Sequence, residues 1–381
     1  MNKLSKLVVF FIFFGLFLQF FNINIVNFSK AESINKNFES MVTIEASTGR
    51  ILYSQDEHKR LPMASTTKIL TAIVAIENCD NLDKKYEISK SATGIEGSSI
   101  YLKAGEHLSV RELLYGLMLR SGNDSAVAIA EIISGSVEKF VLLMNEYCEK
   151  LNLKDTSIVT VNGLHDENHY SSAYDLAIIS AYAMKNEIFA EIVKTKQKNI
   201  DNEFSKFSDH IRVLVNKNRF LDMVNGADGV KIGYTKKAGK CFVGSATRNG
   251  MQVIFVCLNA KTMFDDACEY IEKAFKEYSL VKLLSVGELS KTSIKNGKSE
   301  EVPVILKDDI WYSLTEAELQ KIKGKLVINE NLSAPIKNNT EIGTIELWLE
   351  NNLIFSQKVY TIDVEKKEGI SDFIKKIIKS Y

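Results

Sequence analysis

The chain has 381 residues, of which 45% are hydrophobic and 25% are charged, an ordinary globular composition that allows two domains. Its 48 basic and 48 acidic side chains give a net charge of zero. This balance provides no argument for a nucleic-acid partner, or for membrane binding through bulk charge.

The N-terminus predicts a secretory signal peptide over residues 1–31. Two lysines precede an apolar run over 7–21, and Ser29 and Ala31 supply the small residues that a signal peptidase reads. The competing interpretation is an uncleaved anchor helix, because apolar residues continue beyond this run. Asparagines interrupt the continuation, so we expect cleavage and an exported, extracytoplasmic protein that starts near residue 32.

The five cysteines and five histidines predict neither a disulfide framework nor a metal site. The cysteine count is odd, no CxxC pair occurs, and most cysteines lie in apolar runs where a free thiol acts as a small hydrophobic group. The histidines are scattered and form no HExxH motif. We therefore expect no metal and no cofactor.

A hairpin followed by a helix is predicted near the start of the exported chain. Residues 41–45 and 50–54 are β-branched, aromatic and roughly alternating. The run 69–77 is apolar and helix-forming, and Ser65 precedes it at the N-cap or in the first turn. Lys68 returns to the same helix face, where its neutral amine could take the proton of the Ser65 hydroxyl.

The Ser-x-x-Lys pattern alone does not establish this chemistry, because it occurs four times in the sequence. The plainer interpretation is a serine that caps a helix beside a solvated lysine. Support must come from the residues that follow.

Two buried helices are expected to meet at a polar turn. Apolar residues recur at helical spacing over 109–120, and a second apolar helix is predicted over 126–133. Between them, Ser121 and Asn123 either end and cap the helices around Gly122 or point into a cleft from a rigid support. In a cleft, the hydroxyl could relay a proton and the carboxamide could orient a lysine and a substrate amide.

A helix over 137–151 leads to an irregular stretch and to a further helix that ends at Met184. His165 and His169 lie in the irregular stretch. They could form a pH-sensitive pair, but the pattern favours a position on the loop surface. The polar region 194–219 is interpreted as a hairpin over the cleft.

An edge strand is predicted over residues 231–235. Gly233 lets a substrate backbone lie against the strand, Lys231 supplies positive charge, and the N–H just past the glycine can face a developing oxyanion. Strand-like runs over 241–246 and 252–258 follow, joined by a turn. Because Lys-x-Gly recurs in the chain, this element is also weak by itself.

The character of the chain changes after an amphipathic helix over 265–278. Short β-rich runs predict a small all-β domain over 281–362, beyond a catalytic domain over 32–280. Residues 363–381 predict an amphipathic helix with lysines on one side, which we expect to lie on the outer face of the cell membrane. The alternative is a terminal helix that packs on its own domain.

Ser65-Thr66-Thr67-Lys68, Ser121-Gly122-Asn123 and Lys231-Ile232-Gly233 follow the order of the three active-site motifs of penicillin-recognising serine enzymes. Longer stretches extend the likeness, at residues 96–102, 121–126, 171–176 and 228–231. From about residue 32 to residue 362, the chain resembles low-molecular-mass penicillin-binding proteins of the D-alanyl-D-alanine carboxypeptidase family. The resemblance implies an α/β fold of the α+β type, the penicillin-binding/β-lactamase-like transpeptidase fold. Its antiparallel sheet is flanked by helices, and a small C-terminal all-β domain follows.

The resemblance also implies a mechanism. Ser65 would attack the carbonyl between the two terminal D-alanines of a peptidoglycan stem peptide, with Lys68 as general base. Desolvation and the positive Lys231 would lower the pKa of Lys68 from its usual value of about 10.4. Ser121 would relay a proton to the departing D-alanine, and Asn123 would orient Lys68 and the substrate amide.

Substrate binding is implied for the edge strand. Lys231 would attract the terminal carboxylate, with Gly233 and Thr235 beside it, and the N–H groups of Ser65 and Tyr234 would hold the oxyanion. A β-lactam would acylate Ser65 by the same attack and leave slowly.

The sequence departs from the family pattern at two positions. The third motif usually has a hydroxyl residue where this chain has Ile232, and an arginine is common near the start of the last helix, where this chain reads Phe264-Asp265-Asp266. Losing one or two charge-assisted hydrogen bonds to the carboxylate would weaken transition-state binding by a few kcal/mol, as an order of magnitude. We therefore expect a weaker or differently selective enzyme.

Two other functions remain open at this point. A β-lactamase uses the same three elements, but no glutamate stands in a matching context to activate a deacylating water. A non-enzymatic protein that binds wall peptides or β-lactams is the second, in view of Ile232 and Asp266.

Overall fold

The computed structural model describes residues 37–202, 204 and 211–367. The predicted signal peptide and residues 368–381 of the predicted terminal helix lie outside this part of the chain. The described residues form two compact units. One contains the chain up to Leu283 and Trp311–Glu316, and the other contains Leu284–Ile310 and the chain from Ala317 onward.

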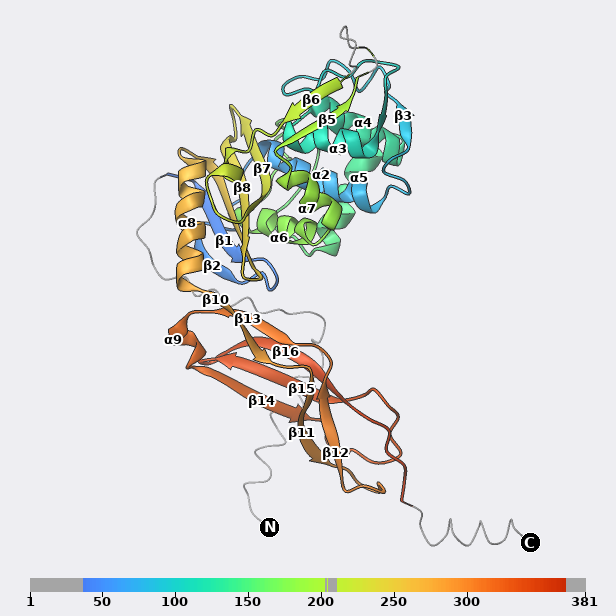
Figure 1. Ribbon diagram of the computed structural model, residues 1–381, viewed down its shortest axis with the longest axis vertical. Helices are drawn as coiled ribbons and strands as arrows, with labels where there is room; N and C mark the ends of the chain where they lie inside the picture. The colour runs from blue at the N-terminus through green and yellow to red at the C-terminus, as the bar shows by residue number, and fades with distance from the viewer. Residues whose placement is uncertain (1–36, 203, 205–210, 368–381) are drawn as a thin grey trace, which may run out of the picture. The chain divides into compact units, whose positions relative to one another are not determined.

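The first unit is built on a five-stranded antiparallel sheet in the order β2-β1-β9-β8-β7 (Figure 1). Its strands are β1 (Ser40–Glu45), β2 (Ile51–Gln55), β7 (Ala227–Thr235), β8 (Gly239–Arg248) and β9 (Met251–Ala260). The two hairpins predicted within this sheet, β1–β2 and β8–β9, are confirmed. The predicted edge strand is also confirmed, because β7 ends the sheet and pairs only with β8.

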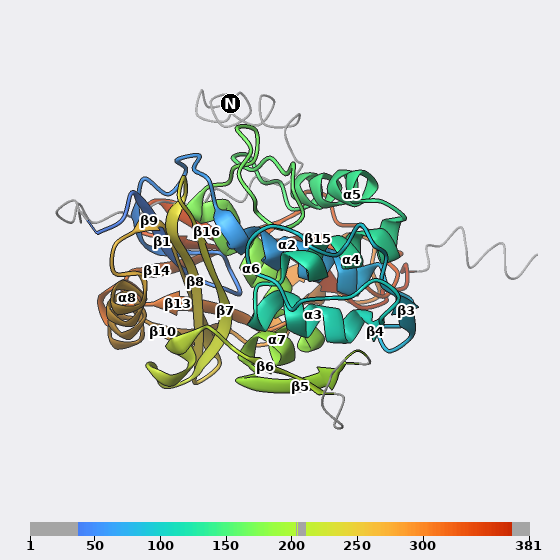
Figure 2. The same cartoon turned by 90° about the horizontal axis from the view of Figure 1, so that it is seen from above.

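Helices cover both faces of this sheet (Figure 2). Side chains alternate between the faces of a strand, so Phe242 packs in the cluster under α8 while Val243 packs against the larger group of helices. The helical elements of the first unit are η1 (Ala64–Thr67), α2 (Lys68–Glu77), α3 (Val110–Leu119), α4 (Asn123–Ser134), α5 (Val137–Lys150), α6 (Ala173–Met184), α7 (Glu187–Lys194), η2 (Arg219–Asp222) and α8 (Met263–Glu277). The short helix α9 (Glu316–Leu319) belongs from Ala317 onward to the second unit.

Three two-stranded sheets complete the regular structure outside the second unit's own sheet. They are β3 (Lys85–Glu87) with β4 (His107–Ser109), β5 (Gln197–Asp201) with β6 (Ile211–Val215), and β10 (Ser279–Leu284) with β13 (Ile310–Leu314). The β5–β6 pair is the hairpin predicted within 194–219. The stretch Trp311–Glu316, which the sequence places in the β domain, belongs to the first unit instead.

The second unit contains a five-stranded antiparallel sheet in the order β11-β12-β16-β15-β14. Its strands are β11 (Gly287–Ser293), β12 (Glu301–Leu306), β14 (Ile322–Ile328), β15 (Thr340–Leu349) and β16 (Asn352–Thr361). Beyond β16, Val364 bridges to Ile336 and Lys366 bridges to Gly297. The chain therefore stays extended to this point, and the predicted terminal helix does not start at residue 363.

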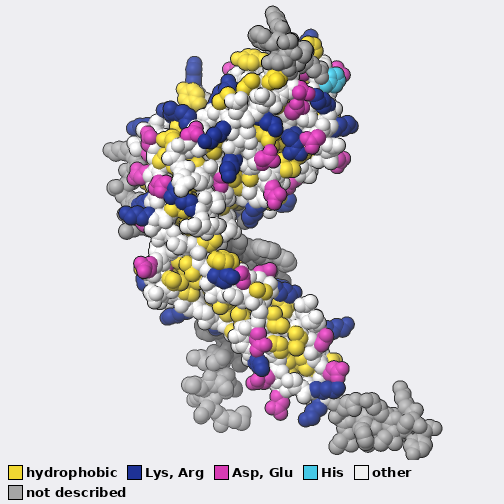
Figure 3. Space-filling model, in the orientation of Figure 1, with side chains coloured by type: hydrophobic (Ala, Val, Ile, Leu, Met, Phe, Trp, Pro, Cys, Tyr) yellow, Lys and Arg dark blue, Asp and Glu magenta, His cyan; other side chains and the backbone are white. Residues whose placement is uncertain are grey.

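The surface carries charges of both signs. Basic and acidic side chains are interspersed over the face of each unit that Figure 3 shows, in keeping with the equal numbers in the sequence. All five cysteines are free thiols. Within residues 37–202, 204 and 211–367, no helix is long and apolar enough to cross a membrane.

Candidate active site

Ser65 lies in a strained turn that leads into α2. Ala64, just before it, has a φ of +47°, a left-handed conformation that costs a non-glycine residue roughly 1–2 kcal/mol. The two threonines after Ser65 hold the turn: Thr66 Oγ1 donates to Met63 O at 2.6 Å, and Thr67 Oγ1 donates to Ala64 O at 2.8 Å. Ser65 is partly exposed between buried neighbours, so its hydroxyl is presented outward. It lies in the first turn rather than at a side-chain cap.

Lys68 is fully buried beside that hydroxyl, as predicted from the spacing. Its Nζ lies 3.0 Å from Ser65 Oγ and 2.7 Å from Asn123 Oδ1, and it also donates to the carbonyl of Asn162. Burial, and then the positive Lys231, hold the pKa of Lys68 well below its usual range, against the opposing effect of Asp124.

The contacts of Lys68 suit a neutral amine. Such a group has two N–H donors and one lone pair. The carbonyl oxygens of Asn123 and Asn162 can only accept, so they take the two donors. The lone pair is then left for the Ser65 hydroxyl, which is the arrangement a general base requires.

The turn between α3 and α4 supplies Asn123 and Ser121. Ser121 has a φ of +63° and Asn123 is the first residue of α4, three residues earlier than the predicted start of that helix. Besides accepting from Lys68, Asn123 donates through Nδ2 to Glu96 O at 2.5 Å, which fixes the orientation of its amide. Ser121 is buried in the same turn, two residues before Asn123.

Asp124 stabilises the loop that faces this turn, a role that the sequence did not reveal. Its buried carboxylate accepts from the N–H groups of Ile100 and Leu102, each at 3.1 Å, and from Ser99 Oγ at 2.5 Å. The loop carrying Glu96, which holds the Asn123 amide, is thereby fixed in place.

Strand β7 lies directly against the Ser65 turn. A Cβ on Gly233 would stand 3.0 Å from the Ser65 nitrogen and 3.2 Å from Met63 O, so glycine allows this approach. Lys231, on the same side of the strand, is 2% exposed and donates to its neighbour's carbonyl at 3.0 Å. Burial, and then the positive Lys217, lower the pKa of Lys231 to about 7.

The remaining predicted residues of β7, Tyr234 and Thr235, lie at the C-terminal end of the strand. Tyr234 is 66% exposed, and Thr235 Oγ1 accepts from Ala238 N at 3.0 Å, within the turn to β8. Ile232 packs in the cluster on the α8 face with Phe242 and Phe264, opposite the side of Lys231 and Gly233.

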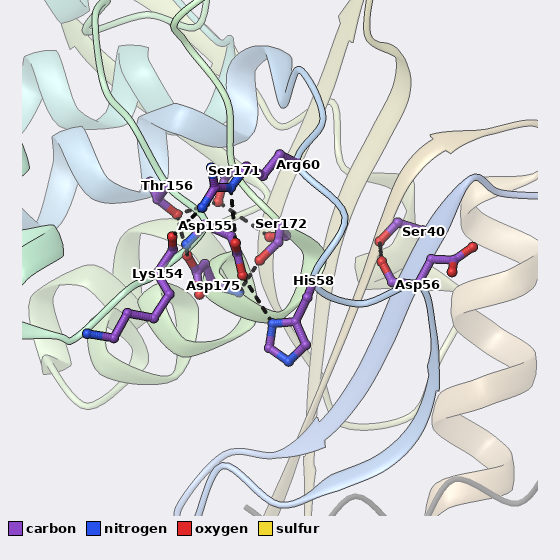
Figure 4. Close-up of polar contacts among 10 residues, drawn as sticks. All are labelled: Ser40, Asp56, His58, Arg60, Lys154, Asp155, Thr156, Ser171, Ser172 and Asp175. Carbon is purple, nitrogen blue, oxygen red and sulfur yellow. Dashed lines mark hydrogen bonds and ion pairs between the residues drawn. The ribbon is translucent and has the colours of Figure 1, made fainter.

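The segment from Asp155 to Asp175, here called the bracket, packs against the Ser65 turn. Its two ends are held by carboxylates (Figure 4): Asp155 accepts from Arg60 Nε at 3.0 Å, and Asp175 accepts from Thr156 Oγ1 at 2.8 Å. In its middle, a Cβ on Gly163 would lie only 2.0 Å from Ala64 O, so the bracket touches the Ser65 turn.

His169, within this bracket, was predicted at the loop surface, and that prediction is wrong. The imidazole is 2% exposed and lies 2.8 Å from Thr67 Oγ1 through Nε2. His165, in contrast, pairs with the exposed carboxylate of Glu167 at 3.6 Å.

No group of three His, Cys, Asp or Glu side chains able to hold a metal occurs in the part of the chain that the structure describes. Ser65, Lys68 and Asn123 have the hydrogen-bond geometry that a serine nucleophile with a lysine base requires. Gly233 brings the edge strand next to the serine, and Lys231 adds a cation that lowers the pKa of Lys68.

The chain matches two family models. Residues 27–262 match D-alanyl-D-alanine carboxypeptidase, and residues 278–367 match the C-terminal domain of penicillin-binding protein 5. The chain is 34% identical over 348 residues to D-alanyl-D-alanine carboxypeptidase DacF of Bacillus subtilis (strain 168), covering 89% of this chain and 88% of the relative. It is 31% identical over 340 residues to DacD of Escherichia coli, covering 85% and 86%.

Solved structures give the same assignment. Penicillin binding protein 5 from Haemophilus influenzae matches with a TM-score of 0.76 and 28% identity, over 88% of this chain and 99% of that chain. Penicillin binding protein 6B from Escherichia coli matches with a TM-score of 0.67 and 27% identity, over 86% and 96%. The predicted fold, with its helix-flanked antiparallel sheet and C-terminal β domain, is confirmed. The chain therefore belongs to the D-alanyl-D-alanine carboxypeptidase family.

Proposed function

We propose that the protein removes the terminal D-alanine from peptidoglycan stem pentapeptides through an acyl-enzyme on Ser65. The observation that carries the proposal is the buried Lys68 amine, 3.0 Å from the Ser65 hydroxyl, with its two other contacts on oxygens that only accept. A lysine in that state takes the hydroxyl proton as the oxygen attacks the carbonyl between the two D-alanines.

The negative charge of the tetrahedral intermediate needs donors near the nucleophile. The N–H groups of Ser65 and Tyr234 are suited to this, since β7 approaches the Ser65 nitrogen at Gly233. When the intermediate collapses, the bond to the terminal D-alanine breaks and the departing amine takes a proton, which reaches it from Lys68 through Ser121. Asn123 orients Lys68 and the substrate amide. Water then hydrolyses the ester between Ser65 and the remaining peptide.

The substrate carboxylate meets Lys231, with Gly233 and Thr235 beside it on the edge strand. Asp266 does not repel the carboxylate directly, because it is 3% exposed and accepts from Asn37 Nδ2 at 3.1 Å and Thr262 Oγ1 at 3.0 Å. Ile232 supplies no hydroxyl. Recognition therefore depends mainly on Lys231, and we expect modest turnover.

Penicillin reacts by the same attack and leaves slowly, since no glutamate of the described chain stands in a sequence context that matches the water-activating glutamate of a β-lactamase. A β-lactamase would instead turn penicillin over rapidly. A non-enzymatic wall-binding protein would be acylated by penicillin yet never release D-alanine.

The protein is proposed to act outside the cell, after removal of residues 1–31, as a peripheral protein on the outer face of the membrane. Its organisation would be a catalytic domain over 32–280, a β domain over 281–362 and an amphipathic helix within 363–381. Chain 32–381 should sediment with vesicles and chain 32–367 should not. Equal sedimentation of the two would contradict a role for the helix.

The catalytic proposal is tested with chain 32–381, a stem pentapeptide and, separately, penicillin. Free D-alanine and a mass increase on the peptide containing Ser65 are expected, and Ser65→Ala should abolish both. Acylation without D-alanine release would support the wall-binding alternative, and rapid penicillin consumption would support the β-lactamase.

A further inference from the structure

His169 makes contacts that determine where its proton lies. Its Nδ1 accepts from the backbone N–H groups of Val159 at 3.0 Å and Thr160 at 3.3 Å. A backbone N–H can only donate, so Nδ1 carries no hydrogen. The proton of the neutral ring is therefore on Nε2, and it is donated to Thr67 Oγ1 at 2.8 Å.

The hydrogen bonds continue from Thr67 into the Ser65 turn. Having accepted from His169, the Thr67 hydroxyl donates its own hydrogen to Ala64 O at 2.8 Å. Ala64 is the residue with the φ of +47°, directly before the nucleophile. A chain of hydrogen bonds therefore links the Val159 N–H to His169, His169 to Thr67, and Thr67 to the carbonyl of the residue that precedes Ser65.

The element that carries His169 is well suited to hold this turn. Its ends are held by the carboxylates of Asp155 and Asp175 (Figure 4), and Ser171 bridges to Leu61 just before the turn. Asn162, in the same bracket, accepts from Lys68. The bracket thus contacts the nucleophile's turn at Thr67 and the base at its Nζ.

We propose that His169 is a positioning residue, whose Nε2–H holds the Thr67 hydroxyl and so keeps Ser65 in its reactive geometry. The inference rests on the proposed function of Ser65 and extends it to a residue that touches neither substrate nor the reacting atoms. Loss of the Thr67 contact is expected to slow acylation, while penicillin binding before the reaction stays the same.

Two substitutions separate the two sides of the ring. H169N keeps an acceptor near the position of Nδ1 and loses the contact with Thr67. H169Q keeps a donor near the position of Nε2 and loses the contact with Val159. H169N should lower the limiting rate of penicillin acylation on the order of 10- to 100-fold, the scale of a misplaced reacting group. H169Q should lie clearly closer to the native rate. H165N is the matched control, and its acylation should be unchanged.

The outcomes are distinct. A native protein that penicillin does not acylate would overturn the proposed function itself, whereas equal limiting rates for H169N and the native protein would overturn only the role of His169. H169Q as slow as H169N would also overturn it, since the Thr67 contact would then not matter. If H169N does not fold, ¹⁵N NMR of the native imidazole decides: a neutral ring protonated at Nε2 supports the proposal, and one protonated at Nδ1 overturns it.

A pH readout follows from the same geometry. Burial lowers the pKa of His169 to about 4, with smaller contributions from His165 and Lys68 and against the opposing effect of Asp166. In the unfolded chain the ring has a pKa of about 6.5, so as pH falls it binds a proton there before it does so in the folded protein. The stability that the neutral ring contributes is therefore fully present above about pH 6.5 and is lost as pH falls towards 4. The melting temperature of the native protein should therefore fall more steeply over this range than that of H169Q. If the melting temperatures of the two proteins fall equally over this range, the proposal of a neutral ring that accepts hydrogen bonds at Nδ1 is contradicted.

Discussion

At the scale of single residues, two buried lysines share one site, and their charges cannot both be kept there. Lys68 is 0% exposed and Lys231 is 2% exposed, and the positive charge of Lys231 disfavours a charge on Lys68 in low dielectric. The proton is lost first from Lys68, which has no carboxylate contact and three partners that suit an amine. Lys231 keeps its proton to higher pH, so one lysine serves as base and the other as cation.

This division predicts a pH profile. With a pKa of about 7, Lys231 is charged below that pH and loses its charge above it, so kcat/KM for D-alanine release should fall as pH rises from about 7 to about 9. Lys231→Arg keeps its charge, because a guanidinium stays protonated, and should move the alkaline fall to higher pH even if the rate is lower. The measurement is kcat/KM across the pH range for both proteins. A flat native profile up to about pH 9 would show that Lys231 does not titrate there.

Ile232 gives a second prediction at this scale. Ile232→Thr adds a hydroxyl on the α8 face of the edge strand, opposite Lys231 and Gly233, where it does not reach the substrate carboxylate, so D-alanine release should stay unchanged. The substitution should destabilise the fold by about 1 kcal/mol, because Ile232 packs in the α8-face cluster. Turnover and thermal unfolding are measured beside Ile232→Val, which keeps an apolar side chain. A rise of a few-fold in the turnover of the threonine variant would contradict this placement of the side chain.

At the scale of elements, the site depends on three segments that meet at the Ser65 turn: the edge strand β7, the α3–α4 turn and the bracket from Asp155 to Asp175. Two of the three approach so closely that they use glycine. The bracket does so at Gly163, whose φ of +83° also suits glycine, and β7 does so at Gly233.

Gly163→Ala tests the contact of bracket and turn. The new Cβ would stand 2.0 Å from Ala64 O, so the two elements must separate, and both acylation rate and melting temperature should fall. Gly105→Ala is the matched control, because Gly105 has a φ of +82° with nothing within 4 Å of the added Cβ. Gly105→Ala should lower the free energy of unfolding only by the roughly 1 kcal/mol that a left-handed backbone costs alanine, and its acylation rate should stay the same. Equal acylation in all three proteins would show that the bracket does not position Ser65.

Much of the site could be predicted from sequence because it lies in local patterns. The spacing of Ser65 and Lys68 on one helical turn, and the alternation along β7, depend only on residues close in the chain. His169 had no such signal, since its burial results from a contact with Thr67, 102 residues away. Asn162 was also missed, because it holds Lys68 through its backbone carbonyl, which every residue type has.

At the scale of the whole molecule, β13 lies inside the range 281–362 that was predicted as the β domain. The structure places Trp311–Glu316 in the first unit. There the Ser313 carbonyl accepts from the buried Arg50, whose guanidinium lies 5.1 Å from the ring centre of Tyr312 and 5.3 Å from that of Tyr278. The residue directly before β2 thus contacts the returning segment through one cation.

Arg50→Ala should lower the free energy of unfolding by about 2–4 kcal/mol, because it removes a buried hydrogen bond to a charged donor and two ring contacts. Lys59→Ala is the control. Its exposed pair with Glu39, at 3.1 Å, should contribute no more than about 1 kcal/mol. Denaturant unfolding of both variants provides the comparison, and equal losses would show that Arg50 does not secure β13.

The return of the chain at residues 311–316 limits how this protein can be recombined with its relatives. A chimera that takes all residues after 283 from another member receives a foreign partner for Arg50 inside its own catalytic half. A chimera that keeps the native stretch 311–316 and exchanges the segments on either side leaves that half intact. The two halves are therefore interleaved in the chain, and one cut cannot separate them.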